Sequence, residues 1–198
     1  ANDGSGAGLS NIEAFIVPRD REGLTINTEN EKTMGLKAFP LSQLTLKDVT
    51  LSAEERLGCE NGINGQQLIN SIRVANSAIC VGLSRAVMET SIPYAKERIA
   101  FGKPIATKQA IAFMLADMRT EVESMRWLVW KAASQLDQGV DACKATILAQ
   151  NYVRKQTVKI ADDGVQVFGG HGYIRDFPME MWLRHALSLT LMEGVVSA

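Results

Sequence analysis

The sequence predicts a mainly α protein, in which part of an antiparallel β domain precedes a C-terminal up-down four-helix bundle. Two observations support this fold class. Hydrophobic residues alternate or are β-branched in the first sixty residues, and after that they recur with the period of an α-helix. The helical segments are long and their connections short, and such helices pack most easily as antiparallel neighbours. We therefore expect a partial β domain over residues 1–60 and a helical bundle domain over residues 61–198.

Three short segments of the first part carry a strand pattern, with charged residues and glycines between them. They are residues 12–18 (IEAFIVP), 24–27 (LTIN) and 43–51 (QLTLKDVTL). The stretch from Thr45 to Leu51 alternates well enough to predict a half-buried antiparallel strand.

Four later segments have apolar residues at helical spacing: residues 65–98, 108–136, 141–168 and a shorter one after Pro178. Pro93 lies inside the first segment and should kink or interrupt the helix. Gly139 is a suitable end for the second helix, and Asp141 is a candidate N-cap for the third. Proline at the start of the short helix is acceptable, because the first turn does not need its N–H group.

Composition excludes several classes of function. The 198 residues are 46% hydrophobic and 22% charged, which is ordinary for a soluble globular protein. A formal net charge of −1 gives no general attraction to nucleic acid or to an anionic membrane. The three cysteines are widely spaced and form no metal-ligand pattern with the two histidines. Their small, odd number suits a reducing compartment. With no signal peptide and no apolar run that could span a bilayer, we expect an intracellular protein without an integral membrane segment.

The first stretch that could carry chemistry is Arg98-Ile99-Ala100-Phe101-Gly102. A cation at the end of a helix complements the helix dipole, and this alone would explain an arginine here. A guanidinium beside a chain reversal is also well shaped to bind a diphosphate. Gln109, at the start of the following helix, could add an amide contact.

The second stretch, Gln166-Val167-Phe168-Gly169-Gly170-His171-Gly172, follows a helix. The glycines therefore differ from the dinucleotide-binding pattern, in which they follow a strand. They are explained either by a helix end with a tight reversal or by close approach of the backbone to a ligand. His171 is predicted to be a loop residue and not a catalyst.

The third stretch is Met192-Glu193-Gly194, near the end of the chain. A carboxylate at the end of a helix is usually a solvated surface group. Glu193, however, follows an apolar segment, and burial there would raise the pKa of its carboxyl group. A base of that kind suits removal of a weakly acidic C–H proton.

In their order and spacing, the three stretches resemble the acyl-CoA dehydrogenase family, in which bound FAD oxidises acyl-CoA thioesters. The resemblance covers nearly the whole chain and corresponds to the second part of the family's β domain and its C-terminal helical domain. It implies that six residues contact the FAD of a neighbouring subunit: Arg98, Phe101, Gln109, Gln166, Gly169 and Gly170.

On the substrate side, the resemblance implies that Glu193 is the catalytic base. Arg184 and Ala186 match the family's R-x-A pattern ahead of the E-G pair. Gly194 and Arg73 are implied to lie at the substrate, although an ordinary ion pair would explain Arg73 equally well. Val195 departs from the family, which usually has a small hydroxyl residue at that position.

The implied reaction is α,β-dehydrogenation of an acyl-CoA to the trans-2-enoyl-CoA, with electrons passed to an electron-transfer flavoprotein. The implied assembly is a homo-oligomer, a dimer of dimers, in the bacterial cytoplasm or the mitochondrial matrix. We expect the chain to be a fragment of the full enzyme, because the family's N-terminal helical domain has no counterpart in it. Two alternatives remain: an acyl-CoA oxidase, and a non-catalytic helical homologue that acts in assembly or interaction.

Overall fold

The described part of the chain, residues 13–192 of this computed structural model, contains five α-helices and two short antiparallel ribbons. It forms two units, the first ending at Ile69 and the second starting at Asn70. In the first unit, β1 (Leu24–Ile26) pairs with β2 (Leu44–Leu46). Two short 3-10 turns follow, Ala53–Glu55 and Cys59–Asn61.

The β segment is less regular than its sequence suggests. The predicted strand over residues 43–51 is wrong beyond Leu46, because Asp48 has a φ of 52° and so leaves the extended region. The prediction of a half-buried strand is also wrong, since all three side chains of β2 are exposed. A two-stranded ribbon by itself buries neither face. Over residues 13–18, the predicted first strand is reduced to one isolated bridge between Phe15 and Arg56.

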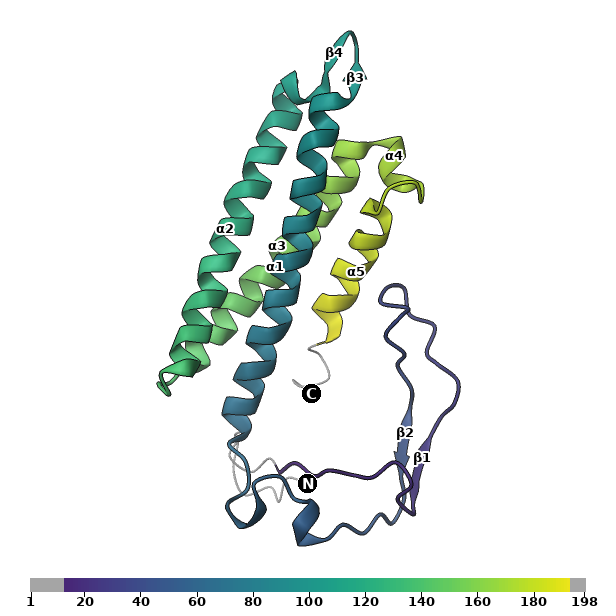
Figure 1. Cartoon of the computed structure of the whole chain (residues 1–198), viewed down its shortest axis with the longest axis vertical. Coiled ribbons are helices and arrows are strands. Elements are labelled where there is room, and N and C mark those ends of the chain that lie inside the picture. The colour runs from purple at the N-terminus through teal and green to yellow at the C-terminus, as the bar shows by residue number, and fades with distance from the viewer. Residues whose placement is uncertain (1–12, 193–198) are drawn as a thin grey trace. The chain divides into compact units, whose positions relative to one another are not determined.

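The second unit confirms the predicted up-down four-helix bundle. Its long helices are α1 (Gly65–Glu97), α2 (Gln109–Asp137), α3 (Cys143–Phe168) and α5 (Met179–Leu191). Figure 1 shows successive long helices running in opposite directions. A small hairpin, β3 (Ile99–Ala100) with β4 (Lys103–Pro104), joins α1 to α2, and the four-residue α4 (Gly170–Tyr173) joins α3 to α5. The sequence did not predict this hairpin or α4.

The helix boundaries follow local chemistry, with two corrections to the prediction. Pro93 does not interrupt α1, which continues to Glu97. Proline removes its own N–H bond, but later bonds persist, and the N–H of Arg98 donates to the carbonyl of Tyr94 at 2.8 Å. The prediction of Asp141 as the N-cap of the third helix is wrong by one residue, because Ala142 is the N-cap of α3. The carboxylate of Asp141, one residue earlier, accepts the N–H of Cys143 at 2.9 Å.

The core of the bundle forms around α3, which packs against α2 and α5 and also contacts α1. Gly164 makes this close contact possible, since a Cβ there would lie 2.4 Å from Cγ1 of Val87 on α1. The buried face of α1 carries four small polar residues at seven-residue spacing: Asn70, Ser77, Ser84 and Ser91. The apolar residues Leu68, Ile72 and Ile79, which stand at helical spacing on α1, are exposed, Ile79 to 57%, whereas Val87 farther along the same stripe is fully buried. The apolar stripe therefore predicted the helix, but its first half, from Leu68 to Ile79, is not part of the buried face.

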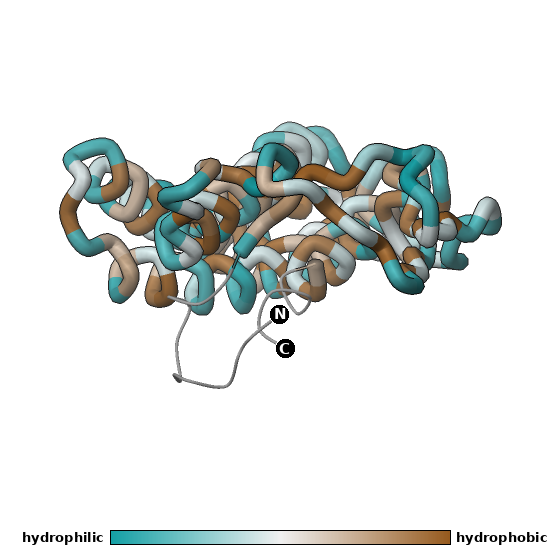
Figure 2. Tube along the Cα trace, turned by 90° about the horizontal axis from the view of Figure 1, so that it is seen from below, coloured by the Kyte–Doolittle hydropathy of each residue, from teal (hydrophilic) through white to brown (hydrophobic). Residues whose placement is uncertain are grey.

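In the part of the chain that the structure describes, no helix combines the length and apolarity needed to cross a membrane. Figure 2 shows hydrophilic residues recurring along the helices. The same residues contain no group of three or more histidine, cysteine, aspartate or glutamate side chains arranged to hold a metal ion.

Candidate functional site

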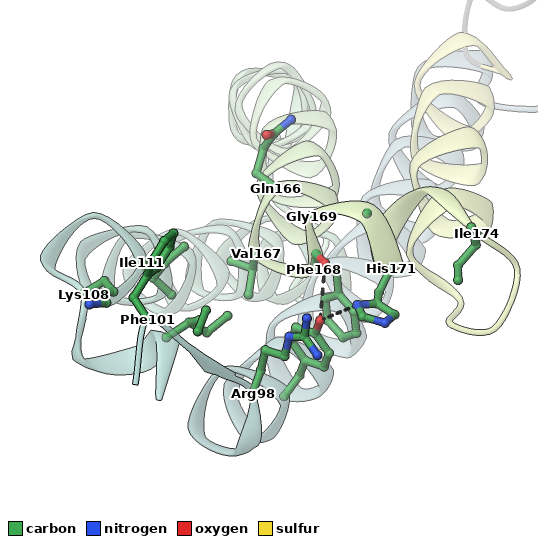
Figure 3. Close-up of a pocket in the computed structure, with 14 residues that line it drawn as sticks. Arg98, Phe101, Lys108, Ile111, Gln166, Val167, Phe168, Gly169, His171 and Ile174 are labelled. Carbon is green, nitrogen blue, oxygen red and sulfur yellow. Dashed lines mark hydrogen bonds between the residues drawn. The ribbon is translucent and has the colours of Figure 1, made fainter. Parts of the chain in front are cut away.

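A groove of about 610 Å³ opens near the end of the bundle where α1, the β3–β4 hairpin, the start of α2 and the α3–α4 turn meet (Figure 3). It is lined by Tyr94, Arg98, Ala100, Phe101, Ile105, Lys108, Ile111, Gln166, Val167, Phe168, Gly169, Gly170, His171 and Ile174. The fold thus brings two of the three motif stretches together, although they are far apart in the sequence. A groove with two cationic side chains and an aromatic and aliphatic lining suits a ligand that has both phosphates and a planar ring.

Arg98 has a fixed backbone between α1 and the hairpin. Its N–H donates to the carbonyl of Tyr94 at 2.8 Å, and its own carbonyl accepts the N–H of Ile105 at 2.9 Å. The side chain is exposed on the groove. Lys108 brings a second cation, with its Nζ 5.8 Å from the centroid of the Phe101 ring.

The tip of the hairpin has a phenylalanine at a position whose backbone conformation does not favour it. Phe101 and Gly102 have φ angles of 52° and 73°, the left-handed pair that a two-residue turn of this type needs. This conformation costs a residue other than glycine about 1–2 kcal/mol. The phenyl side chain of Phe101 is nevertheless 95% exposed, so it gains little from packing within the chain. Neither the turn nor packing within the described residues therefore requires a phenyl group at this position.

The glycines of the α3–α4 turn divide into two kinds. Gly169 has φ 56° and ψ −130°, which only glycine adopts readily. At Gly172 a Cβ would lie 2.6 Å from the carbonyl oxygen of Val165, so glycine is needed for α4 to pack on α3. Neither of these reasons for glycine applies to Gly170, because its φ is not left-handed and a Cβ there would meet no atom within 4 Å. The fold therefore accounts for Gly169 and Gly172 but not for Gly170, which lines the groove.

An aromatic cluster lies beneath this turn. The ring of Tyr94 stacks on that of Phe168, with centroids 3.8 Å apart and planes 13° from parallel. Phe177 meets both rings edge-on, at 5.6 Å from Tyr94 and 5.0 Å from Phe168. The hydroxyl of Tyr94 lies 3.0 Å from Nδ1 of His171 and donates to the carbonyl of Phe168 at 3.3 Å, as the dashed lines in Figure 3 mark.

Of the six predicted FAD contacts, five line the groove: Arg98, Phe101, Gln166, Gly169 and Gly170. Gln109 is the first residue of α2 and is exposed, but it is not among the lining residues, which on α2 and just before it are Lys108 and Ile111. In the view of Figure 3, Arg98 and Gln166 lie on opposite sides of Val167 and Phe168.

The predicted substrate residues are not part of this groove. Arg73 is half-buried on α1, about 37 Å along the helix axis from Arg98 at 1.5 Å per residue. Glu193 and Gly194 lie outside the residues that the structure describes, which end at Met192.

The helix α5, which ends at Leu191, carries an ion pair between two of its own residues. Arg184, the arginine of the R-x-A pattern, donates to both carboxylate oxygens of Glu180, at 2.8 and 3.1 Å. The pKa of the neighbouring His185 is lowered, because partial burial disfavours the charged imidazolium and the positive charge of Arg184 repels it. The charge of Glu180 opposes this shift.

The sequence did not predict several lining residues, and three of them, Tyr94, Lys108 and His171, had a signal in it. Tyr94 lies one helical turn before Arg98, and Lys108 directly precedes Gln109. His171 was predicted to be a loop residue, which is wrong: it lies in α4, and its ring contacts Tyr94. Two glycines flank it closely, and this favoured a loop, because glycine is a poor helix former.

Comparison with known proteins matches residues 64–196 to the acyl-CoA dehydrogenase C-terminal domain. The chain is 35% identical over 189 residues to an acyl-CoA dehydrogenase of Bacillus subtilis. It is 36% identical over 189 residues to CarC, a subunit of the caffeyl-CoA reductase–Etf complex of Acetobacterium woodii. Each alignment covers 94% of this chain and 50% of the relative.

Among solved structures, the butyryl-CoA dehydrogenase of Megasphaera elsdenii aligns with a TM-score of 0.84 at 29% sequence identity. The alignment covers 94% of this chain and 49% of that one. The chain therefore spans about half the length of the relatives that it matches.

Proposed function

This chain belongs to the acyl-CoA dehydrogenase family, and we propose that it provides the C-terminal part of an FAD-dependent enzyme that dehydrogenates acyl-CoA thioesters to trans-2-enoyl-CoA. In this proposal, residues 1–60 correspond to the second part of the family's β domain. Residues 61–198 correspond to its C-terminal helical domain.

One observation carries the proposal. Five of the six residues for which the family resemblance implies an FAD contact line a single groove, although they come from two distant stretches of the chain. Two of them, Phe101 and Gly170, have features that the fold itself does not require, namely a strained exposed phenyl group and a glycine in open space. A ligand in the groove accounts for both features.

The residues of the groove fit FAD chemically. The guanidinium of Arg98 and the ammonium of Lys108 are suited to the diphosphate, and the open backbone at Gly170 allows the adenosine part to come close. Phe101 offers an exposed ring face for a planar group. When bound, FAD supplies the two-electron redox chemistry that amino-acid side chains lack.

We assign the proton transfer to Glu193. Its carboxylate would remove the proton from the α-carbon of the thioester, and the apolar residues before it would raise its pKa toward the range that suits a base. The backbone N–H of the same residue would polarise the thioester carbonyl, which stabilises negative charge as it develops. Gly194 and Arg73 are proposed to border the substrate.

The proposal includes an assembly and an electron acceptor. Arg98, Phe101, Gln109 and the glycine turn would serve the FAD of a neighbouring subunit, so the active unit would be at least a dimer, and a dimer of dimers in the complete enzyme. The acceptor would be an electron-transfer flavoprotein, which is supported by the similarity to a subunit of a caffeyl-CoA reductase–Etf complex. The named relatives are bacterial, which favours the bacterial cytoplasm over the mitochondrial matrix.

The test is a titration of the purified protein with FAD, followed by flavin fluorescence. R98A should weaken binding about 10- to 100-fold, the range expected for losing a charged hydrogen bond to a phosphate. R85A is the matched control, because it removes the same charge from α1, the helix that ends just before Arg98, where Arg85 pairs with Glu89 at 2.7 Å on the surface. We expect R85A to bind within about twofold of the unchanged protein, as surface ion pairs contribute little. Equal affinities in R98A and R85A would exclude the groove as the FAD site.

The reaction class is tested by adding acyl-CoA thioesters to the flavin-loaded enzyme without oxygen. Bleaching of the visible flavin spectrum supports dehydrogenation and identifies the acyl group. Admitting air then separates the two enzyme classes, because an oxidase would release peroxide stoichiometrically and a dehydrogenase would not. A flavin that no acyl-CoA bleaches would contradict the proposed reaction.

A further inference from the structure

We propose that Tyr94 and His171 are positioning residues that fasten the α3–α4 turn to the end of α1, and so hold the two walls of the groove in register. The inference rests on the proposed function only in assigning FAD to that groove. The fastening itself is a property of the chain, and it is tested below without any ligand.

Tyr94 stands where it can join the two walls of the groove. It lies on α1 one turn before Arg98, and its carbonyl accepts the N–H of Arg98 at 2.8 Å. Its side chain reaches the other wall, where the ring stacks on Phe168, the last residue of α3. One residue therefore contacts both the backbone of Arg98 and the helix end that carries Gln166 and the glycines.

The hydroxyl of Tyr94 is within hydrogen-bond distance of two groups of the other wall. The last carbonyls of a helix have no partner inside the helix, and the hydroxyl of Tyr94 donates to one of them, the carbonyl of Phe168, at 3.3 Å. Nδ1 of His171 lies 3.0 Å from the oxygen of the Tyr94 hydroxyl. With the proton of the imidazole on Nδ1, His171 donates to the hydroxyl and the hydroxyl donates to Phe168, so both contacts are satisfied together.

The two contacts of the Tyr94 hydroxyl enclose the glycines of the turn. Phe168 and His171 flank Gly169 and Gly170, so the two hydrogen bonds hold the turn at both sides of its lining glycines. Inside the turn, the N–H of Gly169 donates to the carbonyl of Val165 and the N–H of Gly172 to that of Gly169, both at 2.9 Å. The outer bonds therefore add to these local bonds and to the packing of the Phe168 ring in holding the turn in its shape.

The experiment measures hydrogen exchange at the amides of Gly169 and Gly172 in the ligand-free protein. Y94F keeps the stacked ring but removes the hydroxyl, and exchange at both amides should rise about fivefold, the factor expected for losing one neutral hydrogen bond. H171A should show a similar rise. The double variant Y94F/H171A should exchange little faster than Y94F alone, because both substitutions act through the hydroxyl oxygen of Tyr94. H171N should stay within about twofold of the unchanged protein, since the Asn amide can replace the Nδ1 contact.

Y173F is the matched control. Tyr173 lies in the same turn, but its side chain is 84% exposed, so removing its hydroxyl should leave the exchange of both glycine amides unchanged. Unchanged exchange in Y94F would overturn the inference. So would an H171N variant as fast as H171A, or additive effects of Y94F and H171A.

FAD affinity, measured on the same variants, separates the inference from the proposed function. If both are right, affinity falls in Y94F and H171A and is restored in H171N. If R98A binds FAD as tightly as R85A while the exchange rates follow the stated order, the assignment of FAD to the groove fails and the positioning of the turn stands. If FAD binds and Y94F changes neither its affinity nor the exchange rates, the proposed function stands and the inference fails.

Discussion

Alanine at position 170 should leave the fold at least as stable as before and weaken the binding of FAD. Gly170 begins α4 with a φ outside the left-handed region, and an added Cβ would meet no atom of the chain within 4 Å. Replacing glycine by alanine at such a position typically stabilises a protein by about 0.4–1 kcal/mol, through the smaller entropy of the unfolded chain. In a chain of this size, that corresponds to a rise in Tm of about 1–4 °C.

The effect on the ligand has the opposite sign. The added methyl group would occupy the space that the groove leaves open at this turn, and forcing an extra carbon into a close contact costs about 1–3 kcal/mol. FAD should therefore bind about 5- to 100-fold more weakly in G170A. The assay pairs a thermal melt, followed by helical circular dichroism, with an FAD titration on the same sample.

Two other glycines serve as controls. G82A adds a methyl group on α1, also with no atom within 4 Å, and should raise Tm without changing FAD affinity. G169A forces alanine to a φ of 56° and should lower Tm. The reasoning is refuted if G170A binds FAD as tightly as G82A does. A fall in Tm in G170A would instead show that the turn needs this glycine for its own packing.

Four further predictions follow from single residues. F101N places a residue that favours left-handed φ at the tip of the hairpin, so Tm should rise while FAD affinity falls, measured by the same two assays. G164A brings a Cβ to 2.4 Å from Cγ1 of Val87, so a thermal melt should show Tm falling by about 2–12 °C, with V87A recovering part of the loss. Burial raises the pKa of the Cys80 thiol to about 11. The thiol ionises at a lower pH in the unfolded chain than in the folded one, so its contribution to the free energy of unfolding should shrink as the pH rises above about 9. Denaturant melts at several pH values measure this change, and C80A should remove it. E193Q in the complete enzyme should abolish acyl-CoA turnover and leave flavin bound; unchanged turnover would remove Glu193 from its proposed role.

The order of the helices and most of their bounds could be predicted from the sequence, because a helix is set mainly by local spacing and by its end residues. α2 illustrates this: the apolar face predicted from spacing contains Met118, Val122 and Met125, all of them buried. The β segment was predicted less well. Alternation in residues 43–51 indicates a strand only if a neighbour covers one face, and the short ribbon described here has no such cover at β2.

The buried face of α1 shows a different limit of prediction. The apolar stripe through Ile72 and Ile79 indicated the helix correctly, but the structure buries the face that carries Ser77 and Ser84. Small side chains let α1 approach α3 closely, and the hydroxyl of Ser84 is satisfied locally by the carbonyl of Cys80 at 2.9 Å. Periodicity identifies the apolar face of a helix, but it does not say which neighbour will cover which face.

The sequence by itself determined the fold class, the positions of the long helices and the motif residues that indicate the family. These depend on residue type and on spacing along the chain, which are local properties. Only the tertiary structure decided that Arg98 and the turn from Gln166 to Gly170 line one groove, that Gln109 stays outside it, and that Tyr94 and His171 share a hydrogen bond beneath it. These are contacts between segments some seventy residues apart, and they exist only because the packing of α1 against α3 brings the two helix ends together.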